Sequence, residues 1–162
     1  MNKRIERLFQ IAHLLMPSFL EVHKDILGGR TGVYLAIHPI GKKIDKSVPG
    51  EVIGFLAPEK IEEKKYYATE KIIRMQSNDE YSSFESADDE KNQFGGGIRA
   101  TDFFVAPSGF PPHLDQKFAL LVCLFGEEVC VLNYVQINDN SLLQVNESRR
   151  NNGEKALTLS QY

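Results

Sequence analysis

Residues 93–125 constrain the fold most, because they place three kinds of structural signal in a fixed order. They begin with consecutive glycines at 95–97, which lack a Cβ and so allow positive φ angles and the close approach of another chain or a ligand. Residues 98–106, which follow, are rich in β-branched and aromatic side chains, a composition typical of strands. They predict either one bent strand or two short strands joined near residues 101–102.

A loop and an apolar helix complete this segment. Residues 107–112 are expected to end the strand, because proline cannot donate to a β ladder and glycine favours a turn. The adjacent prolines suit the first turn of a helix, where N–H groups lack intrahelical acceptors. One face of that helix carries Leu114, Phe118, Leu121, Val122 and Phe125. Since its other positions are also mostly apolar, this helix is expected to be the most buried and to end at Gly126.

An amphipathic helix is predicted near the N-terminus. Apolar residues recur at steps of three and four from Ile5 to Phe19, and Asn2 suits the N-cap. Pro17 should kink this helix or split it in two, because it removes an interior hydrogen bond. Polar and charged residues interrupt the apolar run, and no segment approaches the ~20 apolar residues of a membrane span. A cytoplasmic protein is therefore expected.

Two strands and a second helix come next. Residues 31–38 and 51–57 are predicted to form an antiparallel hairpin. Pro58 suits the first turn of a half-buried surface helix, in which Lys71 and Arg74 near the end complement the helix dipole. The inner face of this helix is expected to consist of Ile61, Ala68, Ile72 and Met75.

The remaining segments are interpreted from charge and composition. Residues 77–91 hold six acidic side chains and one basic one, which favours a solvated loop, with a cation-binding loop as the alternative. Residues 129–137 suit a strand and a helix equally. Residues 138–162 are rich in Asn, Ser and Gln and are expected to be a tail that is flexible or ordered by a partner. A single globular domain is therefore expected over residues 1–137.

The order of elements is helix, strand, strand, helix, strand or hairpin, helix. Strand pairs separated by helices predict an α/β (α+β) domain, in which helices pack on a mainly antiparallel sheet in two or three layers. Profilin-like and GAF/PAS-like sandwiches are organised in this way. Doubly wound folds fit less well, because they require strict alternation of strand and helix.

Charge and cysteine content narrow the partners and the compartment. The formal net charge is −3 and the isoelectric point is near 5.8, without a cluster of Lys and Arg. Nucleic acids and anionic membranes attract clustered basic side chains, so neither is an expected partner. Cys123 and Cys130 do not form a Cys-x-x-Cys motif and are interpreted as small core residues in a reducing compartment.

The candidate ligand site combines a backbone without Cβ atoms, an arginine and a helix N-terminus. The guanidinium of Arg99 can hold a carboxylate through two parallel hydrogen bonds. Ser108 lies just before a helix N-terminus, which favours an anion. We expect a pocket between the glycine-rich strand and the final helix, with the following lining residues: Gly95, Gly96, Gly97, Arg99, Thr101, Phe103, Ser108 and His113.

Catalytic and metal-binding motifs are not found in the sequence. The glycines do not follow the P-loop or dinucleotide-binding pattern, and no nucleophile stands in a recognised motif. The four histidines lack metal-ligand spacing, although His38 and His113, at the ends of elements, are the better candidates for a metal or haem ligand.

Three segments together resemble a known family. They are Ser82-Ser83-Phe84-Glu85-Ser86, the glycine-rich "GGGIR" and the loop and helix "SGFPPHLDQKFALLVCL". Their order is similar to that of the GlcG/HbpS-like group of small α/β domains. The resemblance implies a profilin-like fold, haem binding or haem sensing, and assembly into oligomers. It assigns no ligand residue in this sequence.

These observations favour a non-catalytic domain that binds or senses a small anionic metabolite or a haem-like ligand. The alternative is a protein-interaction or assembly domain that docks a partner through a strand edge or through residues 138–162. An enzyme is less favoured, because no acid/base or nucleophile constellation stands out.

Overall fold

The computed structural model describes residues 2–45, 48–128, 150, 151, 153 and 155. The chain divides into two compact units, Met1–Val131 and Leu132–Tyr162, and the fold below is that of the first unit. Residues 129–137, predicted as strand or helix, lie outside the described residues, as does nearly all of the predicted tail at 138–162. The expected boundary after residue 137 also falls there.

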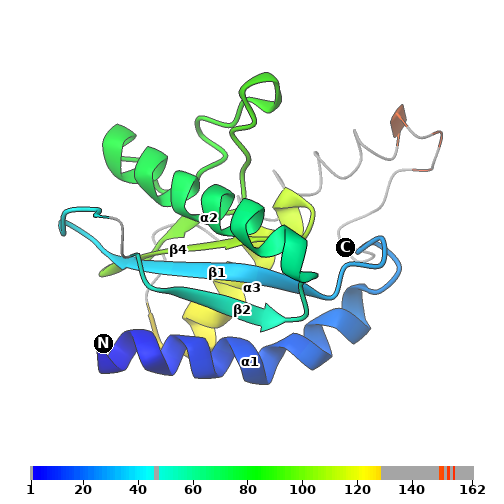
Figure 1. The fold of residues 1–162 in the computed structure, drawn as a ribbon, viewed down its shortest axis with the longest axis horizontal. Coiled ribbons are helices and arrows are strands. Elements are labelled where there is room, and N and C mark those ends of the chain that lie inside the picture. The colour runs from blue at the N-terminus through cyan, green and yellow to red at the C-terminus, as the bar shows by residue number, and fades with distance from the viewer. Residues whose placement is uncertain (1, 46–47, 129–149, 152, 154, 156–162) are drawn as a thin grey trace. The chain divides into compact units, whose positions relative to one another are not determined.

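The described part of the first unit contains three α-helices, one 3-10 helix and four strands. In chain order these are α1 (Lys3–His23), β1 (Gly32–Pro39), β2 (Gly50–Gly54), α2 (Pro58–Asn78), η1 (Asp89–Lys91), β3 (Ile98–Arg99), β4 (Phe103–Ser108) and α3 (Pro112–Phe125). The strands form one antiparallel sheet in the order β2-β1-β4-β3 (Figure 1).

The helices cover both faces of the sheet. Side chains alternate between the two faces along β4, so residues of this strand contact helices on both sides. Phe104 and Ala106 join Ile72 of α2 in a buried cluster. Phe103 points to the other face, where the Arg4 guanidinium of α1 lies 4.9 Å from the centre of its ring. Figure 1 shows α2 on one side of the sheet and α1 on the other, and α3 packs against α1 and β4. The predicted α/β class with an antiparallel sheet is confirmed, in three layers; likeness to profilin-like or GAF/PAS-like folds stays a prediction.

Helix α1 passes through Pro17 without a break, so the predicted split is wrong. The predicted N-cap is confirmed, because the Asn2 side chain accepts the N–H of Arg4 at 2.9 Å. The apolar face of α1 is buried along its whole length, from Ile5 to Phe19. This burial outweighs the one hydrogen bond that proline removes.

Residues 98–108 form two strands joined at residues 101–102, which decides between the two predicted arrangements. Strand β4 ends at Ser108, within residues 107–112 where its end was predicted, and Pro107 is still part of the strand. The carbonyl oxygen of Pro107 accepts a hydrogen bond from Lys71, so the backbone nitrogen and carbonyl group of Pro107 face away from β1. On that side β3 begins only at Ile98, opposite Val105, so the missing N–H of Pro107 removes no ladder bond.

The acidic segment is less solvated than predicted. Within it Glu80, Ser82 and Ser83 are buried. The reason is Arg74, which turns inward and donates to the carbonyl oxygens of Ser83 and Phe94. Arg74 also pairs with Glu70 at 2.9 Å. Lys71 and Arg74, which were predicted only to complement the helix dipole, both have buried side chains.

Helix α3 is buried through most of its length, as predicted. Leu114, Phe118 and Cys123 have no exposed surface, whereas Phe125 in the last turn is 62% exposed. The expected burial of Phe125 is wrong. Cys130 lies outside the described residues. Within the part of the chain that the structure describes, no helix combines the length and the hydropathy of a membrane span.

Candidate functional site

A buried ion pair joins α2 to α3. Lys71 Nζ donates to Asp115 Oδ2 at 3.1 Å and to the carbonyl oxygen of Pro107 at 2.6 Å. Asp115 Oδ1 accepts the N–H of Phe110 at 3.0 Å. The side chains of Lys71 and Asp115 are 1% and 3% exposed. A charged lysine has three N–H groups, and the described residues supply acceptors for two of them.

Burial acts on both partners of this pair. Desolvation lowers the pKa of Lys71, and the neighbouring Asp115 carboxylate offsets part of that change. Desolvation raises the pKa of Asp115, and the Lys71 ammonium and the N–H of Phe110 offset part of it. Both shifts disfavour charge, so each partner depends on the other to remain ionised.

The three consecutive glycines allow this region to pack closely. Gly96 has a φ of +111°, and a Cβ there would lie 2.7 Å from Asp115 Cβ and 2.9 Å from the carbonyl oxygen of Pro112. Added Cβ atoms at Gly95 and Gly97 would also overlap neighbouring side chains. The glycine segment therefore does meet the start of α3, as expected. However, none of the three glycines lines the pockets described below, so they permit close packing and do not form the floor of any of these three pockets.

Two adjoining pockets lie beside α2, and we call them together the α2 groove. The inner pocket has a volume of about 180 Å³ and is lined by Arg30, Lys64, Tyr67, Lys71, Phe94, Ser108, Gly109, Phe110, Pro111, Pro112 and Asp115. The outer pocket has a volume of about 350 Å³ and is lined by Gly29, Arg30, Thr31, Gly32, Phe55, Leu56, Ala57, Lys60, Lys64 and Gly109. Arg30, Lys64 and Gly109 belong to both linings.

The α2 groove carries an excess of positive charge. Four cationic side chains line it, namely Arg30, Lys60, Lys64 and Lys71. Asp115 is the only carboxylate among the lining residues, and Lys71 already binds it. The lining residues of the groove therefore carry more positive than negative charge.

The cations near the groove mouth are weakly engaged. Arg30 donates to the carbonyl oxygen of Leu27 at 3.3 Å and forms no ion pair with another described residue. Lys60 and Lys64 contact the exposed Glu63 at 3.6 Å and 2.9 Å. Exposed pairs of this kind contribute about 0–1 kcal/mol, so they leave both lysines available to a ligand.

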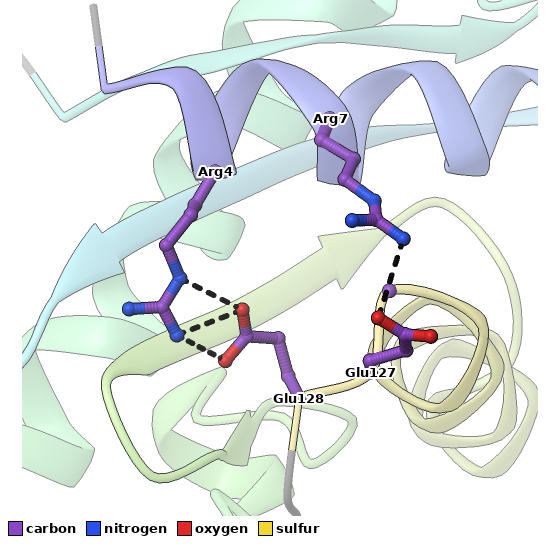
Figure 2. A pocket seen from close by; sticks show the side chains of 5 residues that line it. Arg4, Arg7, Glu127 and Glu128 are labelled. Atoms are coloured by element: carbon purple, nitrogen blue, oxygen red, sulfur yellow. Dashed lines mark hydrogen bonds and ion pairs between the residues drawn. The ribbon is translucent and has the colours of Figure 1, made fainter.

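A third pocket, of about 290 Å³, lies between the start of α1 and the end of α3. Figure 2 shows that each arginine in it faces a glutamate. Arg4 grips Glu128 with hydrogen bonds of 2.7–3.1 Å, and Arg7 lies 3.5 Å from Glu127. The charges compensate one another, so this pocket offers less to an anion than the α2 groove.

Three of the sequence-predicted site residues lie away from the α2 groove. Arg99 donates to Asp79 Oδ1 at 2.6 Å and lies 5.4 Å from the centre of the Tyr81 ring. Thr101 is exposed at the turn between β3 and β4, and Phe103 is buried in the core. None of these three residues lines either pocket of the groove.

The other two predicted residues differ in their relation to the inner pocket. Ser108 is buried at the end of β4 and lines the inner pocket, while its predicted role in ligand binding stays a prediction. His113 does not line it, although the neighbouring Asp115 does. Residues two apart on a helix point about 200° apart, so Asp115 faces α2 while His113 faces away. On that side His113 is close enough to His23 and Lys117 to be affected by their charges.

Acid is expected to destabilise the fold through His113. Burial lowers its pKa from 6.5 to about 4, and the neighbouring His23 and Lys117 add to the effect. Between these two pH values the unfolded chain binds the proton and the folded chain does not, so stability falls as the pH decreases. His113 alone should remove about 2 kcal/mol between pH 7 and pH 5. Urea unfolding at both pH values should show a smaller loss in His113→Gln, and an equal loss would contradict this assignment.

Sequence reasoning missed most of the groove, although one signal was present. Lys60, Lys64, Tyr67 and Lys71 follow one another at steps of four, three and four, which places them on a single face of α2. Apolar spacing alone does not reveal this polar stripe. Arg30 has no comparable signal, because it lies in the loop before β1.

Comparisons with protein-family models, with curated proteins and with solved structures found no match. Haem, which the sequence resemblance implied, does not fit the three pockets well. None of them is lined by His, Cys or Met, and Tyr67 packs its ring against Phe94 at 5.1 Å. Among the described residues, no three His, Cys, Asp or Glu side chains cluster as a metal site.

Proposed function

We propose that this chain is a non-catalytic domain that binds a small anionic ligand, a carboxylate or a phosphate, in the α2 groove. The observation that carries the proposal is Arg30, an arginine without a carboxylate partner among the described residues, beside Lys64 at a pocket whose one carboxylate is already bound. An anion placed between these two cations would accept charge-assisted hydrogen bonds without disturbing the buried pair.

The helix termini support the same proposal. Ala57, the N-cap of α2, lines the outer pocket, and Pro111, the N-cap of α3, lines the inner one. Neither cap residue provides a side-chain hydrogen bond. Both helix N-termini therefore contribute partial positive charge to the groove.

The binding role is preferred to catalysis because of how the buried groups are used. Lys71 and Asp115 are bonded to each other and to backbone groups of Pro107 and Phe110. These contacts hold the groove wall in place. The proposed ligand contacts are therefore Arg30 and Lys64, with the buried pair as their support.

Titration calorimetry with inorganic phosphate and with acetate tests the proposal. We expect at least one of the two anions to bind the unmodified protein, with an affinity that falls as salt increases. The double variant Arg30→Gln, Lys64→Gln should bind about tenfold more weakly or worse, because charge-assisted hydrogen bonds are lost. Lys65→Gln, an exposed lysine on the same helix, and Arg99→Gln are matched controls and should bind normally. Equal weakening in the controls would contradict the proposal, as would the absence of binding of both these anions and of the phosphate esters described below.

A further inference from the structure

We infer that the ligand of the α2 groove carries a single aromatic ring next to its anionic group. This inference rests on the proposed function and specifies the ligand class. The lining of the inner pocket includes two aromatic residues, Tyr67 and Phe94, and the adjacent prolines Pro111 and Pro112. Small polar anions such as phosphate or acetate would leave this apolar wall facing water.

The arrangement of rings favours another ring. Tyr67 and Phe94 meet edge to face, with ring centres 5.1 Å apart and planes inclined by 81°. Aromatic rings prefer such offset or edge contacts, and a ligand ring can extend the arrangement. The cations Arg30 and Lys64 lie in the part of the lining that the inner and outer pockets share, where they can hold an anionic substituent of that ring.

A cation of the lining distinguishes an aromatic ring from an aliphatic group. Lys64 lines the inner pocket, and its ammonium lies 5.8 Å from the centre of the Tyr67 ring. The face of an aromatic ring carries negative charge and attracts an ammonium, whereas a saturated ring does not. The volume of about 180 Å³ lies below the ~300–1,000 Å³ typical of drug-sized ligands, which limits the occupant to one ring.

A series of three phosphate monoesters tests this inference on the unmodified protein. Methyl, cyclohexyl and phenyl phosphate carry the same charged group and differ in the attached group. We expect phenyl phosphate to bind about tenfold more tightly than methyl phosphate and about threefold more tightly than cyclohexyl phosphate. Equal binding of all three would overturn the aromatic ligand and leave anion binding intact. If none of the esters and no simple anion binds, the proposed function itself fails.

The variant Tyr67→Leu tests whether the aromatic ring of the ligand contacts Tyr67 in the inner pocket. In this variant the ratio of phenyl to methyl phosphate affinity should fall to about threefold or less, because the edge contact is lost. Tyr66→Leu is the matched control, since Tyr66 is 66% exposed and does not line the groove. The control should keep the full ratio. An unchanged ratio in Tyr67→Leu, or an equal fall in both variants, would place the ring elsewhere and overturn the inference.

Discussion

Replacing Lys71 with methionine is expected to lower the free energy of unfolding by about 3–5 kcal/mol. Methionine keeps much of the apolar stem but removes the ammonium. Asp115 then remains as a buried carboxylate without its cation, and the Pro107 carbonyl loses its donor. Urea denaturation followed by circular dichroism at pH 7 measures the change.

Two companion variants make this expectation specific. Lys65→Met alters an exposed lysine of the same helix and should change stability by less than about 0.5 kcal/mol. The double variant Lys71→Met, Asp115→Asn should recover part of the loss, because the asparagine oxygen can still accept the N–H of Phe110 without carrying a buried charge. A cost for Lys71→Met no larger than that of Lys65→Met would show that the pair does not hold α2 to α3.

Gly96→Ala is expected to cost about 3 kcal/mol, since two separate penalties act at this position. The backbone φ of +111° is unfavourable for any residue with a Cβ. The added methyl would also meet Asp115 and the carbonyl oxygen of Pro112 at less than 3 Å. Because Pro112 belongs to the first turn of α3, the overlap should disturb the groove as well as the core.

Gly41→Ala separates the two penalties. Gly41 also has a positive φ, of +75°, but a Cβ there would have nothing within 4 Å. Its substitution should therefore cost only the backbone term, about 1 kcal/mol. Equal losses of unfolding free energy in Gly96→Ala and Gly41→Ala would mean that the close approach at Gly96 is unimportant.

The fold was largely predictable because its signals are local. Hydrophobic spacing identified α1, α2 and α3, and two strand segments joined by a loop predicted the hairpin of β1 and β2. Two prolines lie inside regular elements, Pro17 in α1 and Pro107 in β4, for reasons that depend on the tertiary fold. Pro17 sits in a helix whose buried face compensates for it, and Pro107 lies where no ladder partner needs its N–H. Neither compensation can be recognised from neighbouring residues.

The site was less predictable because its contacts join distant parts of the chain. Lys71 meets Asp115, 44 residues away, and Arg74 meets Phe94, 20 residues away. From sequence spacing alone, Lys71 and Arg74 are only two basic residues near the C-terminal end of a helix. Arg99 was expected to bind a ligand, yet it pairs with Asp79, which the fold brings beside it. The start of α3 beyond Ser108 was predictable, because the adjacent prolines are a local signal.

The central claim is that Arg30 and Lys64 hold an anion at the α2 groove, and a crystal structure grown with saturating phenyl phosphate tests it most directly. The account predicts a phosphate group within hydrogen-bond distance of both side chains, with the ring beside Tyr67 and Phe94. An empty groove, or phosphate bound only between Arg4 and Arg7, would contradict it.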